Sequence, residues 1–290
     1  MHRVLCALKA FITWDVHQGT EEARQACGGH GYLEYAGISQ EVLDYASRVT
    51  YEGDNAVLGQ QVGRGLLKQL QLAQTNPEQL DLPAQYLASA PSLLKARWSG
   101  KWTLAALLEA LQVRAASAVI AAAEEVQRLL GEGVSMGSIF SERMQSDLHK
   151  ASQYHAELLI FSSFKSGLER AKLEASAMKH LEKLAKIYGL RCLTQDMLPV
   201  LACGYISGAG AATVESTLQD LIKQLRPQLL PLIEVLAPPD EILFSAIGSK
   251  HLHPYKTLME WTKKYNPLNK RAMLPGFKEH ILPIMQRPRL

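Results

Sequence analysis

The absence of proline from Ser138–Tyr188 is the feature that most constrains the fold. This stretch holds a single glycine, Gly167, and charge pairs such as Glu182 and Lys186 at i,i+4, which support a helix. We predict one very long helix or two joined helices here. Trp102–Leu130 is also rich in alanine and leucine, the strongest helix formers. Because no segment alternates polar and apolar residues as a half-buried strand does, the predicted class is all-α.

Apolar periodicity predicts two helices in the first 75 residues. In Arg3–Gln25 the apolar residues recur at spacings of three and four, so they share one helix face. A second helix is expected to run to about Gln74 from Asp54 or Asn55, either of which can cap its N-terminus. This helix contains three glycines, each of which weakens a helix by roughly 0.5–1 kcal/mol relative to alanine. They are Gly59, Gly63 and Gly65. We infer that another element packs very close to this helix.

Prolines divide the chain into regions. Asn76–Pro91 contains three prolines and separates a glycine-rich first part from an almost purely helical second part. We therefore predict a first domain over residues 1–75, a linker over 76–99 and a second helical domain over 100–290. From His251 onward five further prolines predict short turns and an extended tail.

Composition argues against several classes of function. The net charge is +3 with dispersed lysine and arginine, whereas a nucleic-acid-binding protein usually carries a basic stripe, so no nucleic-acid partner is expected. The four cysteines form no C-x-x-C pair, and Cys27 with His30 supplies only two ligands, so we expect reduced thiols and no metal site. No membrane span is expected either. The most apolar run, Met197–Val214, is interrupted by Ser, Tyr and Thr and is expected as a buried helix or turn.

Two short motifs carry the candidate chemistry. The first, QACGGHGY at Gln25–Tyr32, is on its own a tight turn at a helix end, although its bare backbone N–H groups would let a phosphate or a flat ring approach closely. The second is TYEGDN at Thr50–Asn55. On its own it places Glu52 and Asp54 at a helix N-terminus, where a carboxylate stabilises the helix by about 0.3–1 kcal/mol.

Taken together, the two motifs resemble the C-terminal helical domain of the acyl-CoA oxidase family, within the wider acyl-CoA dehydrogenase superfamily. The resemblance is best over Gln25–Lys68 and includes a trailing Q-x-x-R formed by Gln61 and Arg64. It implies that residues 1–75 are part of the flavin-side helical domain. It also implies that residues 100–290 are the second helical domain with which oxidase chains continue.

The resemblance assigns a chemical role to Glu52. In the family the glutamate of the YEG-type motif removes the α-proton of a fatty acyl-CoA. Such a base must be buried so that its basicity rises, and fixed donors must stabilise the enolate-like charge on the thioester oxygen. The resemblance implies that these donors are the Glu52 backbone N–H and a ribityl hydroxyl of FAD. A hydride then passes from the β-carbon to the flavin, which oxygen reoxidises, and the products are trans-2-enoyl-CoA and hydrogen peroxide.

The resemblance also implies how FAD is bound. The glycine loop is expected to lie against the adenosine-diphosphate part of FAD, often that of a neighbouring subunit, which implies a homodimer. Two residues of the second motif are expected near the flavin. The implied cofactor contacts are Gln25, Gly28, Gly29, Gly31, Asp54 and Asn55.

Some features depart from the family pattern. Ala56 stands where the family usually has threonine, and no segment corresponds to the middle β-domain that holds much of the flavin and acyl-CoA. We expect either a fragment or short isoform of an oxidase, or a non-catalytic helical partner or dimerisation module derived from the family. A dehydrogenase is a third alternative, which Asp54-Asn55 disfavours because dehydrogenases more often carry Thr-Ser there.

The final tripeptide, Pro288-Arg289-Leu290, resembles the peroxisomal import signal of the Ser-Lys-Leu type. Pro288 departs from the usual serine or alanine. This resemblance implies recognition by the peroxisomal import receptor and a peroxisomal location.

Overall fold

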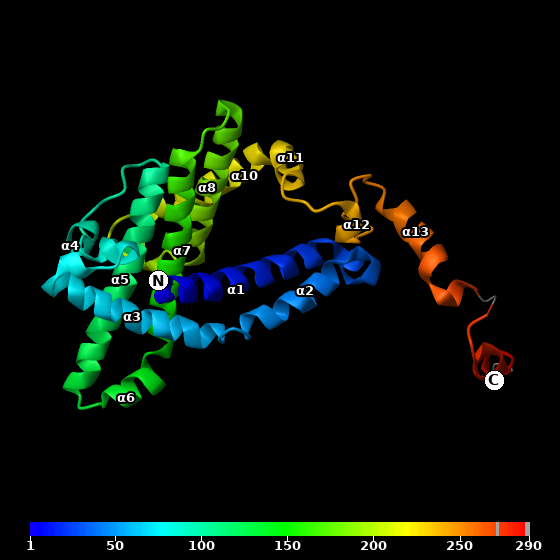
Figure 1. Cartoon of the computed structure of the whole chain (residues 1–290), viewed down its shortest axis with the longest axis horizontal. Coiled ribbons are helices and arrows are strands. Elements are labelled where there is room, and N and C mark those ends of the chain that lie inside the picture. The colour runs from blue at the N-terminus through cyan, green and yellow to red at the C-terminus, as the bar shows by residue number, and fades with distance from the viewer. Residues whose placement is uncertain (271–272, 288–290) are drawn as a thin grey trace. The chain divides into compact units, whose positions relative to one another are not determined.

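Helices occupy most of the segments in which the sequence predicts them. The computed structural model describes residues 1–270 and 273–287, and within these ranges it contains helices and turns but no strand (Figure 1). The all-α class is confirmed. The chain forms two units: the first comprises Met1–Val16 and Ala46–Leu236, and the second comprises His17–Tyr45 and Ala237–Leu290. Helix α1 (His2–Ala26) contributes to both units.

The core of the first unit is a bundle of long helices. Helix α7 contacts α3, α5 and α8, and α8 also contacts α5 and α10. The apolar faces of these helices meet in one main core. The helices are α3 (Asn55–Thr75), α5 (Leu104–Gly131), α7 (Gln145–Arg170), α8 (Ala175–Gln195) and α10 (Gly208–Leu225).

Helix α5 is the most apolar of these helices. Among residues 1–270 and 273–287 it is the one helix long and apolar enough to cross a membrane, by length and composition alone. Half of its most apolar window is buried inside the protein, and it contacts α3, α7, α8 and α9 (Leu198–Ala202). This packing is that of a core helix, which passes the same hydropathy test as a membrane span.

The glycines of α3 allow α7 to approach closely, as the sequence suggested. A Cβ atom at Gly63 would lie 2.5 Å from the Leu148 carbonyl oxygen, and one at Gly59 would lie 2.9 Å from the His149 ring. Gly65 has a similar contact with Arg3 of α1. Glycine is therefore required at Gly63, where the nearest atoms include backbone that cannot move aside easily.

The segment 76–99, expected as a linker, folds onto the first unit. It forms η4 (Pro77–Gln79), η5 (Leu82–Leu87) and α4 (Ala90–Leu93). Most of its apolar side chains lie in or beside the core, although Leu82 is exposed, and the buried ones are Leu80, Ala84, Tyr86, Leu87 and Ala90. The prolines are accommodated because those in η4, η5 and α4 occupy the first turn of their helix, where no N–H is needed.

Of the two alternatives predicted for the long proline-free region, two helices rather than one continuous helix are found. The region begins with α6 (Met136–Ser138) and the π-helical turn η6 (Ile139–Arg143), and α7 and α8 are separated at residues 171–174. This break lets α8 turn back and contact α7. Beyond α9 and α10 the first unit ends with η7 (Arg226–Gln228) and α11 (Leu229–Glu234).

The second unit contains mostly short elements. They are η1 (Gly28–Tyr32), η2 (Glu34–Ala36), most of α2 (Ile38–Ala46), α12 (Asp240–Leu243), α13 (Pro254–Tyr265), η8 (Pro267–Lys270), η9 (Phe277–Ile281) and α14 (Leu282–Met285). The short element η3 (Ser47–Val49) follows α2 and belongs to the first unit.

Helix α13 corrects the prediction of turns and an extended tail after His251. Pro254 lies in the first turn of the helix, so it starts α13 rather than interrupting it. Trp261 stacks on Phe244 at 4.9 Å between ring centroids and meets the Tyr35 ring edge-on at 6.0 Å. These aromatic contacts hold α13 within the second unit.

Candidate functional site

The second motif forms a turn that leads directly into α3. Asp54 is the N-cap of this helix, and its Oδ1 accepts hydrogen bonds from the backbone N–H groups of Ala56 at 2.9 Å and Val57 at 3.3 Å. The prediction that Asp54 or Asn55 caps this helix is confirmed, with Asp54 in that role. A cap of this kind stabilises a helix by about 1 kcal/mol.

Asn55 has a different environment from the cofactor contact that was expected. It is 1% exposed, and its Nδ2 donates to the Ala10 carbonyl at 2.8 Å and to Thr13 Oγ1 at 2.9 Å. Its Oδ1 accepts a hydrogen bond from Lys9 Nζ at 2.8 Å. Because both ends of the amide are engaged inside the chain, the Asn55 side chain binds the turn to α1 and is not presented to a ligand.

Glu52 is the carboxylate of the turn that remains uncommitted. Its backbone has φ = +58°, in the left-handed region that only glycine, asparagine and aspartate adopt easily. The residue is exposed, and among the residues that the structure describes its carboxylate has no hydrogen-bond or ion-pair partner. The burial expected of a catalytic base is therefore not provided by the described part of this chain.

Glu52 lies at a groove of about 540 Å³ formed with α1. The groove is mainly apolar, with a few polar side chains among its lining residues. Its lining residues are His2, Leu5, Cys6, Leu8, Lys9, Ile12, Thr13, Glu52 and Leu58. Leu5 and Ile12 are 58% and 42% exposed, so this face of α1 is open to an apolar ligand.

The glycines of the first motif belong to the second unit and differ in why glycine is needed. Gly28 has φ = +57°, which favours glycine at the end of α1. A Cβ atom at Gly31 would lie 2.0 Å from the Arg24 carbonyl oxygen, so close packing demands glycine there. At Gly29 neither reason applies, because its φ is not positive and a Cβ would meet nothing within 4 Å.

The open position at Gly29 bears on whether FAD fits this loop. A glycine whose bare backbone faces open space can admit a phosphate or a ring at close range. Gln25 is exposed as well, and its Nε2 donates to Glu21 Oε1 at 2.8 Å, while its amide oxygen can accept a hydrogen bond. The donor set of the loop therefore fits a phosphate-bearing cofactor.

The candidate residues are divided between the two units. Glu52, Asp54 and Asn55 lie together in the first unit. Gln25, Gly28, Gly29 and Gly31 lie together in the second unit. No group of three or more metal-ligating side chains gathers within residues 1–270 and 273–287. The tripeptide Pro288-Arg289-Leu290 lies outside the described residues.

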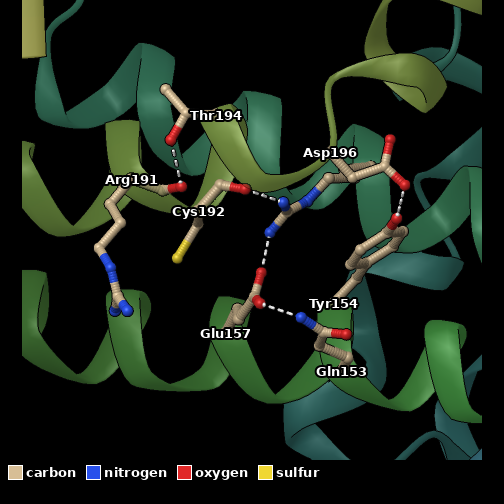
Figure 2. Close-up of polar contacts among 8 residues, drawn as sticks. Gln153, Tyr154, Glu157, Arg191, Cys192, Thr194 and Asp196 are labelled. Atoms are coloured by element: carbon tan, nitrogen blue, oxygen red, sulfur yellow. Dashed lines mark hydrogen bonds and ion pairs between the residues drawn. The ribbon is translucent and has the colours of Figure 1, made fainter. Parts of the chain in front are cut away.

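The sequence did not reveal a buried polar network between α5, α7 and the end of α8 (Figure 2). Arg114 is fully buried and donates to the Glu157 carboxylate and to the Cys192 carbonyl. Its guanidinium carbon lies 4.4 Å from the centre of the Tyr154 ring, a cation–π contact. Burial raises the pKa of the Cys192 thiol to about 12, so this cysteine is protonated and unreactive.

The same network extends to Asp196 at the end of α8. Figure 2 shows the Tyr154 hydroxyl meeting the Asp196 carboxylate, to which it donates, and Lys150 Nζ lies 2.7 Å from the same carboxylate. Burial alone would raise the pKa of Asp196, but the hydrogen bonds from Lys150 and Tyr154 hold it below its usual value. Each charge in this network has a partner of opposite sign, so its role is structural.

The acyl-CoA oxidase family model matches residues 103–286, and the model of the acyl-CoA oxidase C-alpha1 domain matches residues 1–67. The chain belongs to the acyl-CoA oxidase family.

Individual relatives agree with this assignment. Peroxisomal acyl-coenzyme A oxidase 1 of Rattus norvegicus is 28% identical over 99% of this chain and 44% of its own length. The structure of Arabidopsis thaliana acyl-CoA oxidase 1 superposes with a TM-score of 0.90 at 29% identity and covers 98% of this chain. A Caenorhabditis elegans acyl-CoA oxidase-2, bound with FAD, ascaroside-CoA and ATP, gives a TM-score of 0.90 at 25% identity, with 98% of this chain and 42% of its own covered. The chain thus spans less than half the length of these relatives.

Proposed function

We propose that this chain supplies the catalytic-base turn of an FAD-dependent acyl-CoA oxidase. Glu52 takes the α-proton of a fatty acyl-CoA, and the reaction yields trans-2-enoyl-CoA and hydrogen peroxide in fatty acid β-oxidation. One observation carries the proposal. The two polar residues that follow Glu52-Gly53 are engaged, Asp54 in capping α3 and Asn55 in binding α1, whereas the Glu52 carboxylate has no partner in the described chain.

The backbone of Glu52 supports this assignment. A non-glycine residue in the left-handed region carries roughly 1–3 kcal/mol of strain, and such residues cluster at functional sites. Asparagine or glycine would occupy this position with less strain. The presence of glutamate therefore favours a role for its carboxylate beyond folding.

The groove beside Glu52 supports an acyl substrate. Its walls are mainly apolar, and burying a methylene group there contributes about 0.8 kcal/mol. Glu52 lines the same groove, so a ligand whose chain lies along α1 would bring its polar end near the carboxylate. An acyl thioester has this combination of an apolar chain and a polar reacting end.

The glycine loop would hold the cofactor. Gly28 and Gly29 are exposed and present backbone with no side chain in the way, and Gln25 offers an exposed amide. Gly31 is buried and lets the loop pack closely on Arg24. When bound, FAD would accept the hydride from the β-carbon and pass the electron pair on to oxygen. The residues of this chain would bind and orient the reactants, and Glu52 would hold the abstracted proton on its carboxylate.

The proposed assembly and location have different support. The homodimer is what the family resemblance of the glycine loop implies, and import into the peroxisome is expected because the rat relative is named a peroxisomal enzyme. The import receptor would recognise Pro288-Arg289-Leu290.

A second candidate is a non-catalytic helical partner or dimerisation module. The exposure of Glu52 favours it, because a carboxylate in contact with water is too weak a base to take the α-proton of a thioester. Under the first proposal, the substrate, the cofactor or polypeptide beyond these residues covers Glu52. Under the second candidate, Glu52 stays exposed to water.

A flavin spectrum and a turnover assay separate the two candidates. The purified chain is examined for flavin absorbance and then mixed with FAD and palmitoyl-CoA while peroxide is followed. We expect bound flavin and peroxide formation, and a loss of at least about 100-fold in kcat for Glu52→Gln, the usual scale for removal of a general base. Glu41→Gln, at an exposed carboxylate on α2, is the matched control. A colourless protein without turnover would support the non-catalytic candidate.

A further inference from the structure

Lys9 makes two contacts with the turn that carries Glu52. Its Nζ donates to the Gly53 carbonyl at 2.7 Å and to Asn55 Oδ1 at 2.8 Å. Gly53 directly follows Glu52, and Asn55 is the first residue of α3. One ammonium group therefore joins the turn to the start of the helix. A charged donor makes each of these hydrogen bonds stronger than one between neutral groups.

The turn needs such support because of its backbone. Glu52 and Gly53 both have positive φ values, +58° and +100°. Two consecutive residues in this region give a tight reversal with few local hydrogen bonds to hold it. The strain at Glu52 persists only where the surroundings fix the conformation. Lys9 engages the Gly53 carbonyl, the group whose orientation the two unusual residues determine.

The other side-chain hydrogen bonds of the turn do not involve the Gly53 carbonyl. Asp54 is engaged with the N–H groups of α3, and the Asn55 amide with Ala10 and Thr13 of α1. These contacts lie after Gly53 in the chain. Among the described residues, Lys9 supplies the side-chain hydrogen bond to the Gly53 carbonyl, and the Leu58 side chain adds apolar packing against Gly53.

We propose that Lys9 is a positioning residue for Glu52. It fixes the Glu52–Gly53 reversal so that the carboxylate stays at the groove along α1, and it does so through its hydrogen bond to the Gly53 carbonyl. This inference rests on the proposed function of Glu52 as the base. If it is correct, the turnover rate depends in part on a residue that lies 43 positions before the base.

Kinetics of Lys9 variants test the inference. Lys9→Met removes both hydrogen bonds, and Lys9→Arg keeps a cationic donor. Because a displacement of about 1 Å at a catalytic group can reduce the rate by about 100-fold, we expect kcat to fall 10- to 100-fold in Lys9→Met with KM changed less than about twofold. Lys9→Arg should recover most of the loss. The control is Arg3→Met, which removes from the same helix a cation that donates to the Gly65 carbonyl at 3.2 Å. It should leave kcat unchanged.

A second measurement does not depend on turnover. The carbonyl ¹³C shift of Gly53 and the hydrogen exchange of the Ala56–Leu58 amides report the turn directly. Lys9→Met should move the shift and speed this exchange about tenfold, while amides in α5 keep their rates. If wild type turns over acyl-CoA but Lys9→Met keeps its kcat, the inference is wrong. If wild type does not turn over, the proposed function fails. Unchanged shift and exchange in Lys9→Met would then overturn the anchoring role as well.

Discussion

Protonation of His155 should destabilise the first unit as the pH falls. This α7 residue is 3% exposed, and its Nδ1 lies 3.2 Å from the Tyr86 hydroxyl. Burial, with a smaller contribution from the positive charge of Arg3, lowers the pKa of His155 from 6.5 to about 4. Burial also raises the pKa of Tyr86, so its hydroxyl keeps its proton and can donate to Nδ1.

The sign and size follow from linkage. The unfolded chain binds a proton at His155 near pH 6.5, whereas the folded chain binds it only near pH 4. Between these values the unfolded state holds more protons, so the free energy of unfolding decreases as the pH falls. The contribution of neutral His155 is complete above pH 6.5. By pH 4 roughly 3 kcal/mol is lost, with a steepest slope of about 1.4 kcal/mol per pH unit.

Urea unfolding of the whole chain at several pH values between 4 and 7.5, at constant ionic strength, measures this loss. His155→Gln removes the titrating group and should show a shallower dependence, by up to one proton. His251→Gln, at an exposed histidine, is the matched control for replacing a histidine. Equal slopes for wild type and His155→Gln between pH 4 and 6.5 would refute the reasoning, because all other titrating groups are shared.

Two further predictions concern the packing of the first unit. Gly63→Ala should destabilise the chain by about 2–3 kcal/mol, since the new Cβ would meet the Leu148 backbone, whereas Gly167→Ala, with open space around it, should be neutral or stabilising by up to about 1 kcal/mol. Thermal unfolding compares the two; equal effects would contradict the close contact of α3 and α7. Arg114→Met should cost about 3–5 kcal/mol because it leaves Glu157 buried without its partner, and adding Glu157→Leu should restore most of that loss. A double-mutant cycle in urea that shows no coupling would contradict the ion pair.

The helices were predictable where local chemistry determines them. Asp54 was a predicted candidate for the cap of α3. The glycines of that helix predicted a close neighbour, and that neighbour is α7. Two joined helices were one of the alternatives for the proline-free region, but the position of the break at residues 171–174 was not predictable, since this segment contains neither proline nor glycine. It exists because α8 must reverse to pack on α7. The proline pattern misled for α13, because a proline in the first turn starts a helix as readily as it ends one.

Much of the site depends on contacts between residues far apart in the sequence. The motif identified Glu52, but the contact of Lys9 with Gly53 spans 44 positions and the burial of Asn55 depends on α1. Likewise, Arg114 in an alanine-rich helix gives no sign of Glu157, 43 positions later. Such pairs arise from tertiary packing, which periodicity and propensity do not encode.

The capping role of Asp54 has a consequence for how sequences like this one change over time. The residues after Glu52 are needed to begin α3 and to join it to α1, whether or not any chemistry takes place. Selection for folding alone would preserve Asp54 and Asn55 in a descendant that had stopped oxidising lipids. A glutamate kept in its strained conformation is therefore a more informative trace of catalysis than the acidic and amide residues beside it.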